Sequence, residues 1–311
     1  MKKWAHGLVI INPTAGGEKP KGTSISINNI RLWTSALDFV SGADAGWPII
    51  ETTADGKWLE NLEKQIRASR PELICVVGGD GTIAEVVRQI LNLHSEQAPT
   101  LLVIPAGRGN DIVRGLLGFR AHPETFSKWG NKQEWQVKSL DVARVQIGDD
   151  VSSHINFFNM ASIGYGGSVT RNAHTRQSFW SKTSAVYIVE GLLGYFESPD
   201  YGVQISVDGT RIYKGPLFAA FVGNGPANGH GLYWLQNAQF DDGKIDFCVF
   251  SKPPLRKFFT TLGDLKNRGA LPFNNKSGHG REILFEFAES VDLELDGEHI
   301  CRSNRYLFGV E

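Results

Sequence analysis

Residues 72–91, ELICVVGGDGTIAEVVRQIL, decide the fold of the first half of this chain. The stretch opens with Glu72–Val77, a mostly apolar run of the length that is typical of a buried strand. Gly78-Gly79-Asp80-Gly81-Thr82 follows and makes a sharp turn possible. Apolar side chains then recur at the spacing of one helix face, at Ile83, Val86, Val87, Ile90 and Leu91.

The glycine-rich turn, Gly78–Thr82, has the features of a phosphate-binding loop. Its three glycines let the backbone approach a phosphate without a Cβ collision. The helix that follows presents free N–H groups and the positive end of its dipole to an anion. We expect Asp80 to orient Mg²⁺ or a water bound to it, and Thr82 to cap the helix. An ordinary strand-to-helix turn is the alternative, because the chain has five Asp-Gly pairs, but two glycines before Asp-Gly-Thr are much rarer.

The alternation of strand and helix continues on both sides of this stretch. Repeated strand-helix units with apolar strands predict a doubly wound, mostly parallel α/β sheet with helices on both faces. Ligands of such sheets bind beyond the carboxyl ends of the strands. The further strands are expected at Gly7–Asn12, Pro48–Thr53 and Thr100–Ile104, and the further helices at Ile30–Val40, Trp58–Ile66 and Ile112–Leu117.

Three unusual loops fall at those carboxyl ends: Asn12–Gly17, Gly78–Thr82 and Pro105–Asp111. The first is not a Walker A sequence, because no Gly-Lys-Ser/Thr follows it. In the third, Asn110 and Asp111 are suited to cap the next helix, and Arg108 is suited to meet a phosphate. The convergence of the three loops predicts a nucleotide site at one edge of the sheet.

From about Trp135 the sequence changes to short β-prone runs. Asp208-Gly209 between two of them signals a hairpin, and helical patterns interrupt only at about Trp180–Phe196 and Leu255–Lys266. We therefore predict a nucleotide-binding domain over residues 1–135 and a β-rich, sandwich-like domain over 136–311, whose last segment could pack back on the first. The runs are Leu140–Ile147, His154–Met160, Val203–Val207, Pro216–Val222, Ile245–Phe250, Ile283–Phe287 and Val291–Leu295.

The composition excludes several classes of function. The formal net charge is −1, so no global field draws the chain to nucleic acid, which is not an expected partner. The three cysteines are far apart, with Cys75 expected in the core, and the eight histidines lack metal-ligand spacing, so neither a disulfide framework nor a zinc site is expected. No signal sequence or membrane span is recognisable, which predicts a cytoplasmic protein.

Contact with a membrane would need a local patch. Arg171, Arg176 and Lys182 flank Phe179 and Trp180 at the start of a helical stretch, which would suit a membrane surface. Basic and aromatic residues on an ordinary helix face are the commoner case.

Together the three loops resemble those of the diacylglycerol kinase catalytic domain family, which includes bacterial diacylglycerol kinases, related lipid kinases, and sphingosine and ceramide kinases. That family carries an Asn-Pro-x-(Ser/Ala)-Gly loop, a Gly-Gly-Asp-Gly-Thr loop and a Pro-x-Gly-Thr-x-Asn-Asp loop. Two departures are Arg108, where the family usually has Thr, and His230, which interrupts a usual Gly-Gly. The resemblance covers nearly the whole chain and includes Asn159–Gly167, Phe221–Gly231, Asp241–Asp246 and Asp296–Glu298.

The resemblance implies catalytic roles for three carboxylates. Glu298 would be the general base, Asp296 would support the metal network, and Asp80 would organise Mg²⁺ and phosphate. An ordinary hairpin turn is the alternative for residues 296–298. The ATP site would be lined by Asn12, Pro13, Thr14, Ala15, Gly16, Thr52, Gly78, Gly79, Asp80, Gly81, Thr82, Ile83, Ala84, Gly107, Arg108 and Asn110.

The segment around Asp242 resembles a structural Mg²⁺ site of the same family. The ligands would be the Asp242 carboxylate and the backbone carbonyls of Gln239 and Lys244. A plain surface turn is the alternative for this segment.

The sequence therefore predicts an ATP-dependent, Mg²⁺-using lipid kinase with its active site in a cleft between two domains. It would transfer the γ-phosphate of ATP to a lipid hydroxyl, with diacylglycerol, which gives phosphatidic acid, as the default acceptor. The protein would reach its lipid by binding transiently and peripherally to the inner face of the membrane. A strand edge of the second domain could pair two subunits into a homodimer. The alternatives are an NAD kinase-like enzyme, which shares the glycine-rich turn, and a non-catalytic nucleotide-binding relative.

Overall fold

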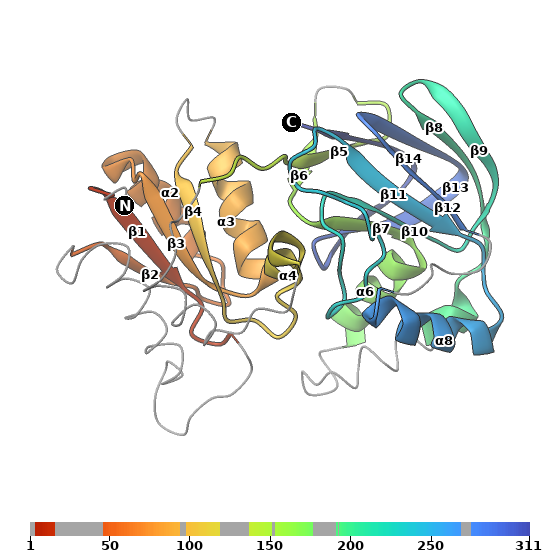
Figure 1. Cartoon of the computed structure of the whole chain (residues 1–311), viewed down its shortest axis with the longest axis horizontal. Helices are drawn as coiled ribbons and strands as arrows, with labels where there is room; N and C mark the ends of the chain where they lie inside the picture. The colour runs from red at the N-terminus through yellow and green to blue at the C-terminus, as the bar shows by residue number, and fades with distance from the viewer. Residues whose placement is uncertain are drawn as a thin grey trace. The chain divides into compact units, whose positions relative to one another are not determined.

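The computed structural model describes residues 4–15, 46–93, 98–118, 137–150, 153–176, 191, 193–268 and 275–311 (Figure 1). The chain divides into two compact units between Ser139 and Leu140. The predicted boundary between residues 135 and 136 and the predicted helix over residues 30–40 lie outside the described residues. No helix among the described residues is long and apolar enough to cross a membrane.

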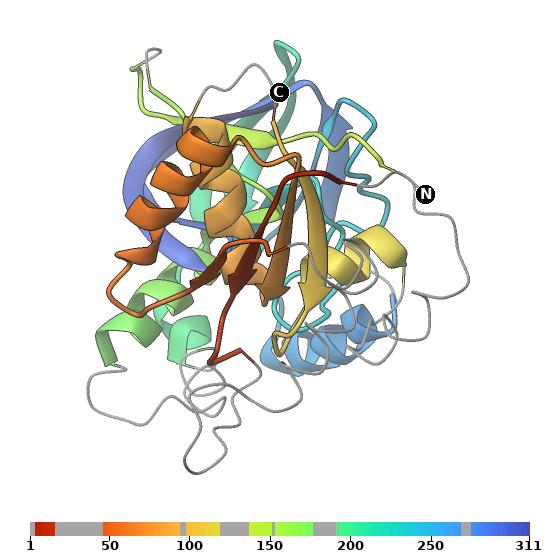
Figure 2. The same ribbon diagram turned by 90° about the vertical axis from the view of Figure 1, so that its left-hand side faces the viewer.

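The first unit is the predicted parallel α/β domain. Its sheet has the order β2-β1-β3-β4, and each neighbouring pair runs parallel. Helices α2 and α3 lie together on one side of this sheet (Figure 2). The described elements are β1 (Gly7–Ile11), β2 (Ile49–Glu51), α2 (Trp58–Ser69), β3 (Leu73–Gly78), α3 (Asp80–Asn92), β4 (Thr100–Pro105) and α4 (Asp111–Leu117).

Burial follows the apolar pattern of the sequence at the centre of this sheet. Every residue of β1 and β3 is buried, including Cys75, as predicted. Ile83 and Val86 of α3 are fully buried, and each contributes on the order of 2 kcal/mol by leaving water. Strand β4, predicted as an apolar strand over residues 100–104, is less buried than β1 and β3, because only its last two residues are buried. β4 forms one edge of the described sheet and is covered less completely than the central strands.

The second unit is the predicted antiparallel, β-rich domain. The ten strands that the structure describes here form one sheet with the order β12-β11-β10-β7-β13-β14-β5-β6, to which β8 and β9 are joined through β13. The elements are β5 (Ala143–Ile147), β6 (Ile155–Phe157), β7 (Met160–Gly164), α6 (Tyr165–Arg176), β8 (Tyr201–Val207), β9 (Thr210–Leu217), β10 (Ala219–Gly223), β11 (Ile245–Phe250), α8 (Leu255–Lys266), β12 (Asn275–Gly280), β13 (Glu282–Leu295) and β14 (Glu298–Val310).

Strand β13 organises this unit because it has different partners along its length. Its first half pairs with β8, its last three residues pair with β7, and β14 runs along its other edge. The two runs predicted as separate strands, residues 283–287 and 291–295, are therefore one strand with an irregularity between Glu286 and Val291. The last strand, β14, pairs with β13 and β5 within this unit. The turn between β13 and β14 is thereby held beside β7.

Helix α6 is absent from the sequence-based prediction, which placed helices of this half only at residues 180–196 and 255–266. Two glycines in its first turn, Gly166 and Gly167, lower its helical propensity and concealed it. They are needed for close packing, because a Cβ on Gly167 would lie 2.8 Å from the carbonyl oxygen of Asp292. Most of the helix predicted over residues 180–196 lies outside the described residues, whereas α8 is confirmed.

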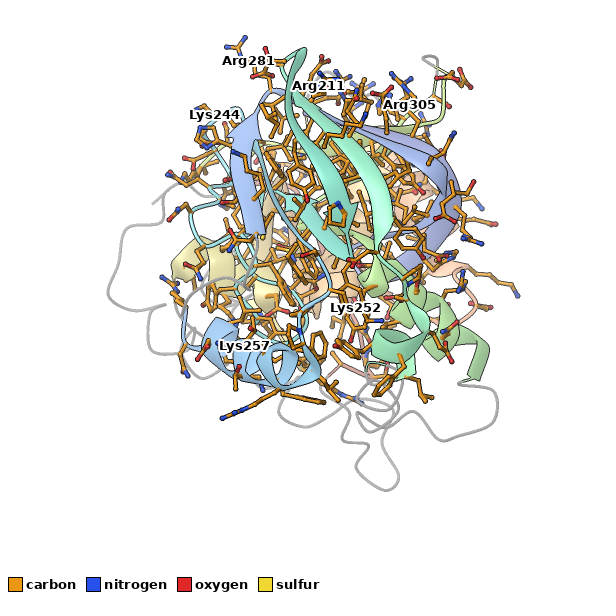
Figure 3. The ribbon with its side chains drawn as sticks, turned by 90° about the vertical axis from the view of Figure 1, so that its right-hand side faces the viewer. Arg211, Lys244, Lys252, Lys257, Arg281 and Arg305 are labelled. Atoms are coloured by element: carbon orange, nitrogen blue, oxygen red, sulfur yellow. The ribbon has the colours of Figure 1, made fainter. Side chains whose placement is uncertain are left out.

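The predicted hairpin at Asp208-Gly209 is confirmed. Both residues have positive φ, 48° and 77°, as a two-residue turn of this kind requires. Oδ1 of Asp208 accepts the backbone N–H groups of Arg281 and Glu282, each at 2.9 Å. Arg281 and Arg211 lie together at this end of the β8–β9 hairpin (Figure 3).

Candidate active site

Asn12, the first residue after β1, ties its loop to the glycine-rich turn. Its backbone N–H donates to the carbonyl of Val77 at 2.9 Å, and its Nδ2 donates to Oγ1 of Thr82 at 2.9 Å. Its Oδ1 accepts the N–H of Thr14 at 3.0 Å. The predicted capping of the helix by Thr82 is wrong, because Gly79 is the N-cap and no side chain caps α3. Thr82 is buried within the helix, where its hydroxyl accepts the Asn12 amide.

The glycine-rich turn also meets the loop after β4 at very short range. A Cβ on Gly107 would lie 2.5 Å from Cα of Gly79 and 2.9 Å from Oδ1 of Asn110. The N–H of Ala106 donates to the carbonyl of Gly78 at 2.8 Å. Glycine is therefore required at 79 and 107 for these loops to pack, before any ligand is considered.

Asp80 connects the glycine-rich turn to helix α4. Its Oδ1 accepts the backbone N–H of Ile112, in the first turn of α4, at 2.9 Å. The predicted cap of this helix by Asn110 is wrong. Asn110 occupies the N-cap position with φ 53°, but its Oδ1 accepts the N–H of Gly107 at 2.9 Å instead. Asp111 forms an ion pair with Arg114 inside the helix, at 3.4 Å.

The loops after β1 and β2, which carry further residues predicted to line an ATP site, lie at the same edge of the sheet. Residues 13–15 form the turn that Asn12 closes, since the N–H of Ala15 donates to the Asn12 carbonyl at 3.1 Å. The N–H of Thr52 donates to the carbonyl of Ile11 at 2.8 Å, which places Thr52 next to the end of β1. The structure thus brings together the loops after β1, β2, β3 and β4.

Side-chain exposure limits what some of these residues can contribute. Ile83 and Ala84 have buried side chains, so only their backbone could face a nucleotide. Arg108 is exposed. Gly16 lies outside the described residues.

In the second unit, Asp296 joins the β13–β14 turn to the link between β6 and β7. Its Oδ1 accepts the N–H groups of Asn159 at 2.9 Å and Met160 at 3.2 Å, and its Oδ2 accepts that of Phe158 at 2.9 Å. Asp296 and Gly297 have φ of 49° and 94°. Residues 296 and 297 thus form the turn of the β13–β14 hairpin, and the Asp296 carboxylate accepts three backbone N–H groups, while the catalytic role of the segment stays a prediction.

A buried carboxylate two residues before Asp296 was missed in the sequence. Glu294 is 4% exposed; its Oε2 accepts the Ser162 hydroxyl, and its Oε1 accepts the N–H of Gly297. Burial, and to a smaller degree the nearby charge of Asp296, raises the pKa of Glu294 to about 7 from 4.5. The row of acidic residues at 292, 294 and 296 was the available signal, because Asp292 and Glu294 are alternate residues of β13 and Asp296 follows in the turn.

Asp292, the first residue of that row, is buried in an ion-pair network. It accepts hydrogen bonds from Arg171 Nη1 at 2.7 and 2.8 Å and from Ser168 Oγ at 3.2 Å, and it lies 2.9 Å from Nε2 of His299. Arg171, suggested in the sequence as part of a membrane-binding patch, thus pairs with Asp292 through Nη1, and the patch itself stays a prediction. The other members of that patch, the Arg176 side chain and residues 179, 180 and 182, lie outside the described residues.

Glu298 is the first residue of β14 and is exposed. It is the partner of Leu295 in the β13–β14 ladder, directly after the turn. Among the residues that the structure describes, its carboxylate has no hydrogen-bond or ion-pair partner. An exposed carboxylate on a fixed backbone can accept a proton from a bound hydroxyl group.

Asp242, the predicted Mg²⁺ ligand, lies in an exposed turn next to a second carboxylate. Its Oδ1 accepts the N–H of Lys244 at 3.1 Å, and Oδ2 of Asp141 accepts the N–H of Gly243 at 2.7 Å. Lys244 Nζ lies 3.5 Å from Nε2 of His279, at the surface seen in Figure 3. Asp141 was missed because it lies about a hundred residues away in the sequence.

The oxygen donors of this turn, carboxylates and carbonyls, are of the type that Mg²⁺ prefers. Burial raises the pKa of Asp246 to about 6 from 3.8, and the charge of Asp242 adds to this rise. No group of three or more His, Cys, Asp and Glu side chains with a metal-binding arrangement occurs within the described ranges. A Mg²⁺ ion here would thus use backbone carbonyls and water in addition to Asp242.

His230 adopts a conformation that glycine would take at lower cost. Its φ is 67°, and its neighbours Gly229 and Gly231 have φ of 68° and 88°. Three consecutive residues, 229–231, thus have positive φ, and His230 is the one among them that is not glycine.

Comparison with known proteins shows which family the chain resembles. The family described as the diacylglycerol kinase catalytic domain matches residues 6–145. A protein of Chromohalobacter salexigens named "Probable lipid kinase YegS-like" is 30% identical over 234 residues, which cover 73% of this chain and 70% of that protein. A Pseudomonas putida protein of the same name is 26% identical, covering 84% and 82% of the two chains.

Among solved structures, a diacylglycerol kinase from Bacillus anthracis has a TM-score of 0.66 with 21% sequence identity, covering all of this chain and 95% of the other. This likeness shows the fold. Together with the loops at the sheet edge and the sequence matches, it leads to one conclusion: the chain belongs to the diacylglycerol kinase catalytic domain family.

Proposed function

We propose that this protein transfers the γ-phosphate of ATP to the hydroxyl group of a lipid, with diacylglycerol as the default acceptor and phosphatidic acid as the product. The observation that carries the proposal is that contacts with two neighbouring loops fix the glycine-rich turn, Gly78–Thr82. Asn12 holds Thr82 from one side, and Gly107 meets Gly79 from the other. The names of the sequence relatives supply the lipid class.

The loops of the first unit are suited to hold the nucleotide phosphates. The first N–H groups of α3 have no partners inside the helix and point toward its N-terminal end, where an anion is favoured. A nucleotide phosphate would add to this end without displacing a side chain, because no side chain caps α3. Asp80 would organise the phosphate and metal network from the same turn. Mg²⁺, when bound, would neutralise phosphate charge.

Glu298 is proposed as the general base. The lipid hydroxyl oxygen attacks the γ-phosphorus, the bond from that phosphorus to the ADP oxygen breaks, and the hydroxyl proton passes to the Glu298 carboxylate. Its exposure and its free carboxylate in the described part of the chain support this role. Asp80 is the second candidate for the base.

Asp242 is proposed to hold a separate, structural Mg²⁺ together with the carbonyls of Gln239 and Lys244. The neighbouring Asp141 carboxylate fixes Gly243 and so shapes the same turn. The proposal also includes transient binding at a membrane surface, because the acceptor is a lipid.

The alternatives are an NAD kinase-like enzyme and a non-catalytic nucleotide-binding relative. Labelled ATP offered with diacylglycerol, other lipid alcohols in detergent, or NAD separates them. Labelled phospholipid supports the proposal, and labelled NADP supports the NAD kinase-like alternative. ATP binding without transfer to any acceptor supports the non-catalytic alternative.

A further inference from the structure

The turn that carries Glu298 is fixed from behind by a buried acid. Glu294 accepts the Ser162 hydroxyl with one oxygen and the Gly297 N–H with the other. Gly297 directly precedes Glu298, so the hydrogen bond acts on the backbone that carries the proposed base. We propose that Glu294 is a positioning residue for phosphoryl transfer, which holds the backbone of residues 296–298 and thereby the place of Glu298. This inference rests on the proposed function, because that function gives Glu298 its role.

Glu294 is buried without a counter-ion. Within the described part of the chain, no Lys, Arg or His pairs with it, whereas Asp292 on the same face of β13 is paired with Arg171 and His299. Burying a carboxylate without a cation is costly, and an apolar side chain would avoid that cost. The arrangement is stable only because two donors, Ser162 and Gly297, satisfy the carboxylate.

A second Asp-Gly hairpin in the same unit shows that the turn itself does not need such an acid. Asp208 and Gly209 have nearly the same φ values as Asp296 and Gly297, 48° and 77° against 49° and 94°. The residue two positions before Asp208 is Ser206, which is not buried. No side chain among the described residues accepts the N–H of Gly209. The Glu294 contact is therefore an addition to the hairpin at the one place where the next residue is the proposed base.

Glu294 and Asp296 hold the turn against β7 and against the short link that precedes β7. Asp296 accepts N–H groups from residues 158–160, at the start of β7, and Glu294 reaches Ser162 two residues further along β7. β7 is also paired with β13 through Leu295 and Ala161. Side-chain and backbone contacts thus fix the turn against β7 and the link before it, and the Glu298 side chain stays exposed.

The test compares Glu294→Leu, which removes the acceptor for Gly297, with Glu294→Gln, which keeps an acceptor oxygen. For folded Glu294→Leu we expect kcat to fall about 10-fold or more, with the KM for ATP changed less than about 2-fold. Glu294→Gln is expected to restore kcat to within about 3-fold of wild type. Ser168→Ala is the matched control for Ser162→Ala, since Ser168 is also a buried serine but donates to Asp292. Ser162→Ala should lower kcat and Ser168→Ala should not.

Amide hydrogen exchange at Gly297, read by NMR, tests the same contact without any assay of activity. Exchange should be faster in Glu294→Leu and unchanged in Glu294→Gln. If Glu294→Leu does not fold, Ser162→Ala and Glu294→Gln carry the comparison. Wild-type kcat in folded Glu294→Leu, or unchanged exchange at Gly297, overturns the inference. Loss of Gly297 protection in a protein with no lipid kinase activity would instead refute the proposed function while leaving the contact established.

Discussion

The carboxylate of Asp80 accepts the backbone N–H of Ile112 at 2.9 Å. The acidic residue of the glycine-rich turn therefore caps a helix that follows a different strand, β4. Asp80 thus has a structural task in addition to the proposed task at the phosphates, and the two tasks can be separated by substitution.

Asp80→Asn is expected to keep stability and lose transfer, whereas Asp80→Ala is expected to lose both. Asparagine retains an oxygen that can accept the Ile112 N–H, but alanine removes the cap at a cost of about 1 kcal/mol. Transfer should fall by about 100-fold or more in both variants, because the charge that organises the phosphates is gone. Denaturant unfolding and the transfer rate measure the two effects. Transfer at the wild-type rate in Asp80→Asn would rule out the proposed role.

The glycines of the site divide into those needed for packing and those proposed to approach a phosphate. Gly107→Ala places a Cβ 2.5 Å from Cα of Gly79 and is expected to cost about 1–3 kcal/mol of stability. Gly81 has nothing within 4 Å of an added Cβ and lies in α3, so Gly81→Ala should raise stability by about 0.5–1 kcal/mol. Calorimetry should nevertheless show weaker ATP binding by Gly81→Ala. Wild-type affinity in that variant would contradict a phosphate site at this turn.

The turn at Asp242 is expected to bind Mg²⁺ and so to make stability depend on the metal. At about 100 times the dissociation constant, binding adds about 2.7 kcal/mol to the free energy of unfolding. Asp242→Asn should remove most of the increase in melting temperature that Mg²⁺ produces. Asp208→Asn, at the Asp-Gly turn of the β8–β9 hairpin, is the matched control and should keep it. An equal Mg²⁺ response in wild type and Asp242→Asn would show that the metal does not bind there.

Glu294 is expected to make the protein less stable as the pH rises. Its folded pKa, about 7, lies above its ordinary value of 4.5, so the folded state holds the proton more tightly than the unfolded chain. The stabilisation is complete below about pH 4.5 and is lost as the pH rises through about 7. Glu294→Gln cannot titrate, so its stability relative to wild type should improve by on the order of 3 kcal/mol across this interval. Denaturant unfolding at several pH values measures the free energy of unfolding of both proteins. If the difference between them did not change with pH, the claim that Glu294 is a buried carboxylate without a counter-ion would be contradicted.

The first unit was largely predictable because its signals are local. Continuous apolar runs marked β1 and β3, and helical spacing marked α2 and α3. The hydrogen-bond partners of the polar residues were not predictable, because they join separate strand-helix units. Thr82 and Asn110 both sit at helix starts and would suit capping, yet their oxygens are used by Asn12 and Gly107.

In the second unit, close packing overrode local propensity. Helix α6 begins with glycines that disfavour a helix, and those glycines permit its contact with β13. Asp296 and Glu298 were found through the resemblance to a family, but Glu294 and Asp141 carry no motif. Their roles depend on contacts with Ser162 and Gly243, which only the folded chain brings about.

The most direct test of the account supplies γ-labelled ATP, Mg²⁺ and diacylglycerol in mixed micelles to the wild-type protein and to Glu298→Gln, with a parallel reaction that contains NAD. The account predicts labelled phosphatidic acid from the wild type, at least about 100-fold less from Glu298→Gln, and no labelled NADP. Full transfer by Glu298→Gln would contradict the assignment of the base. Label in NADP, or no labelled phosphatidic acid from the wild type, would contradict the central claim.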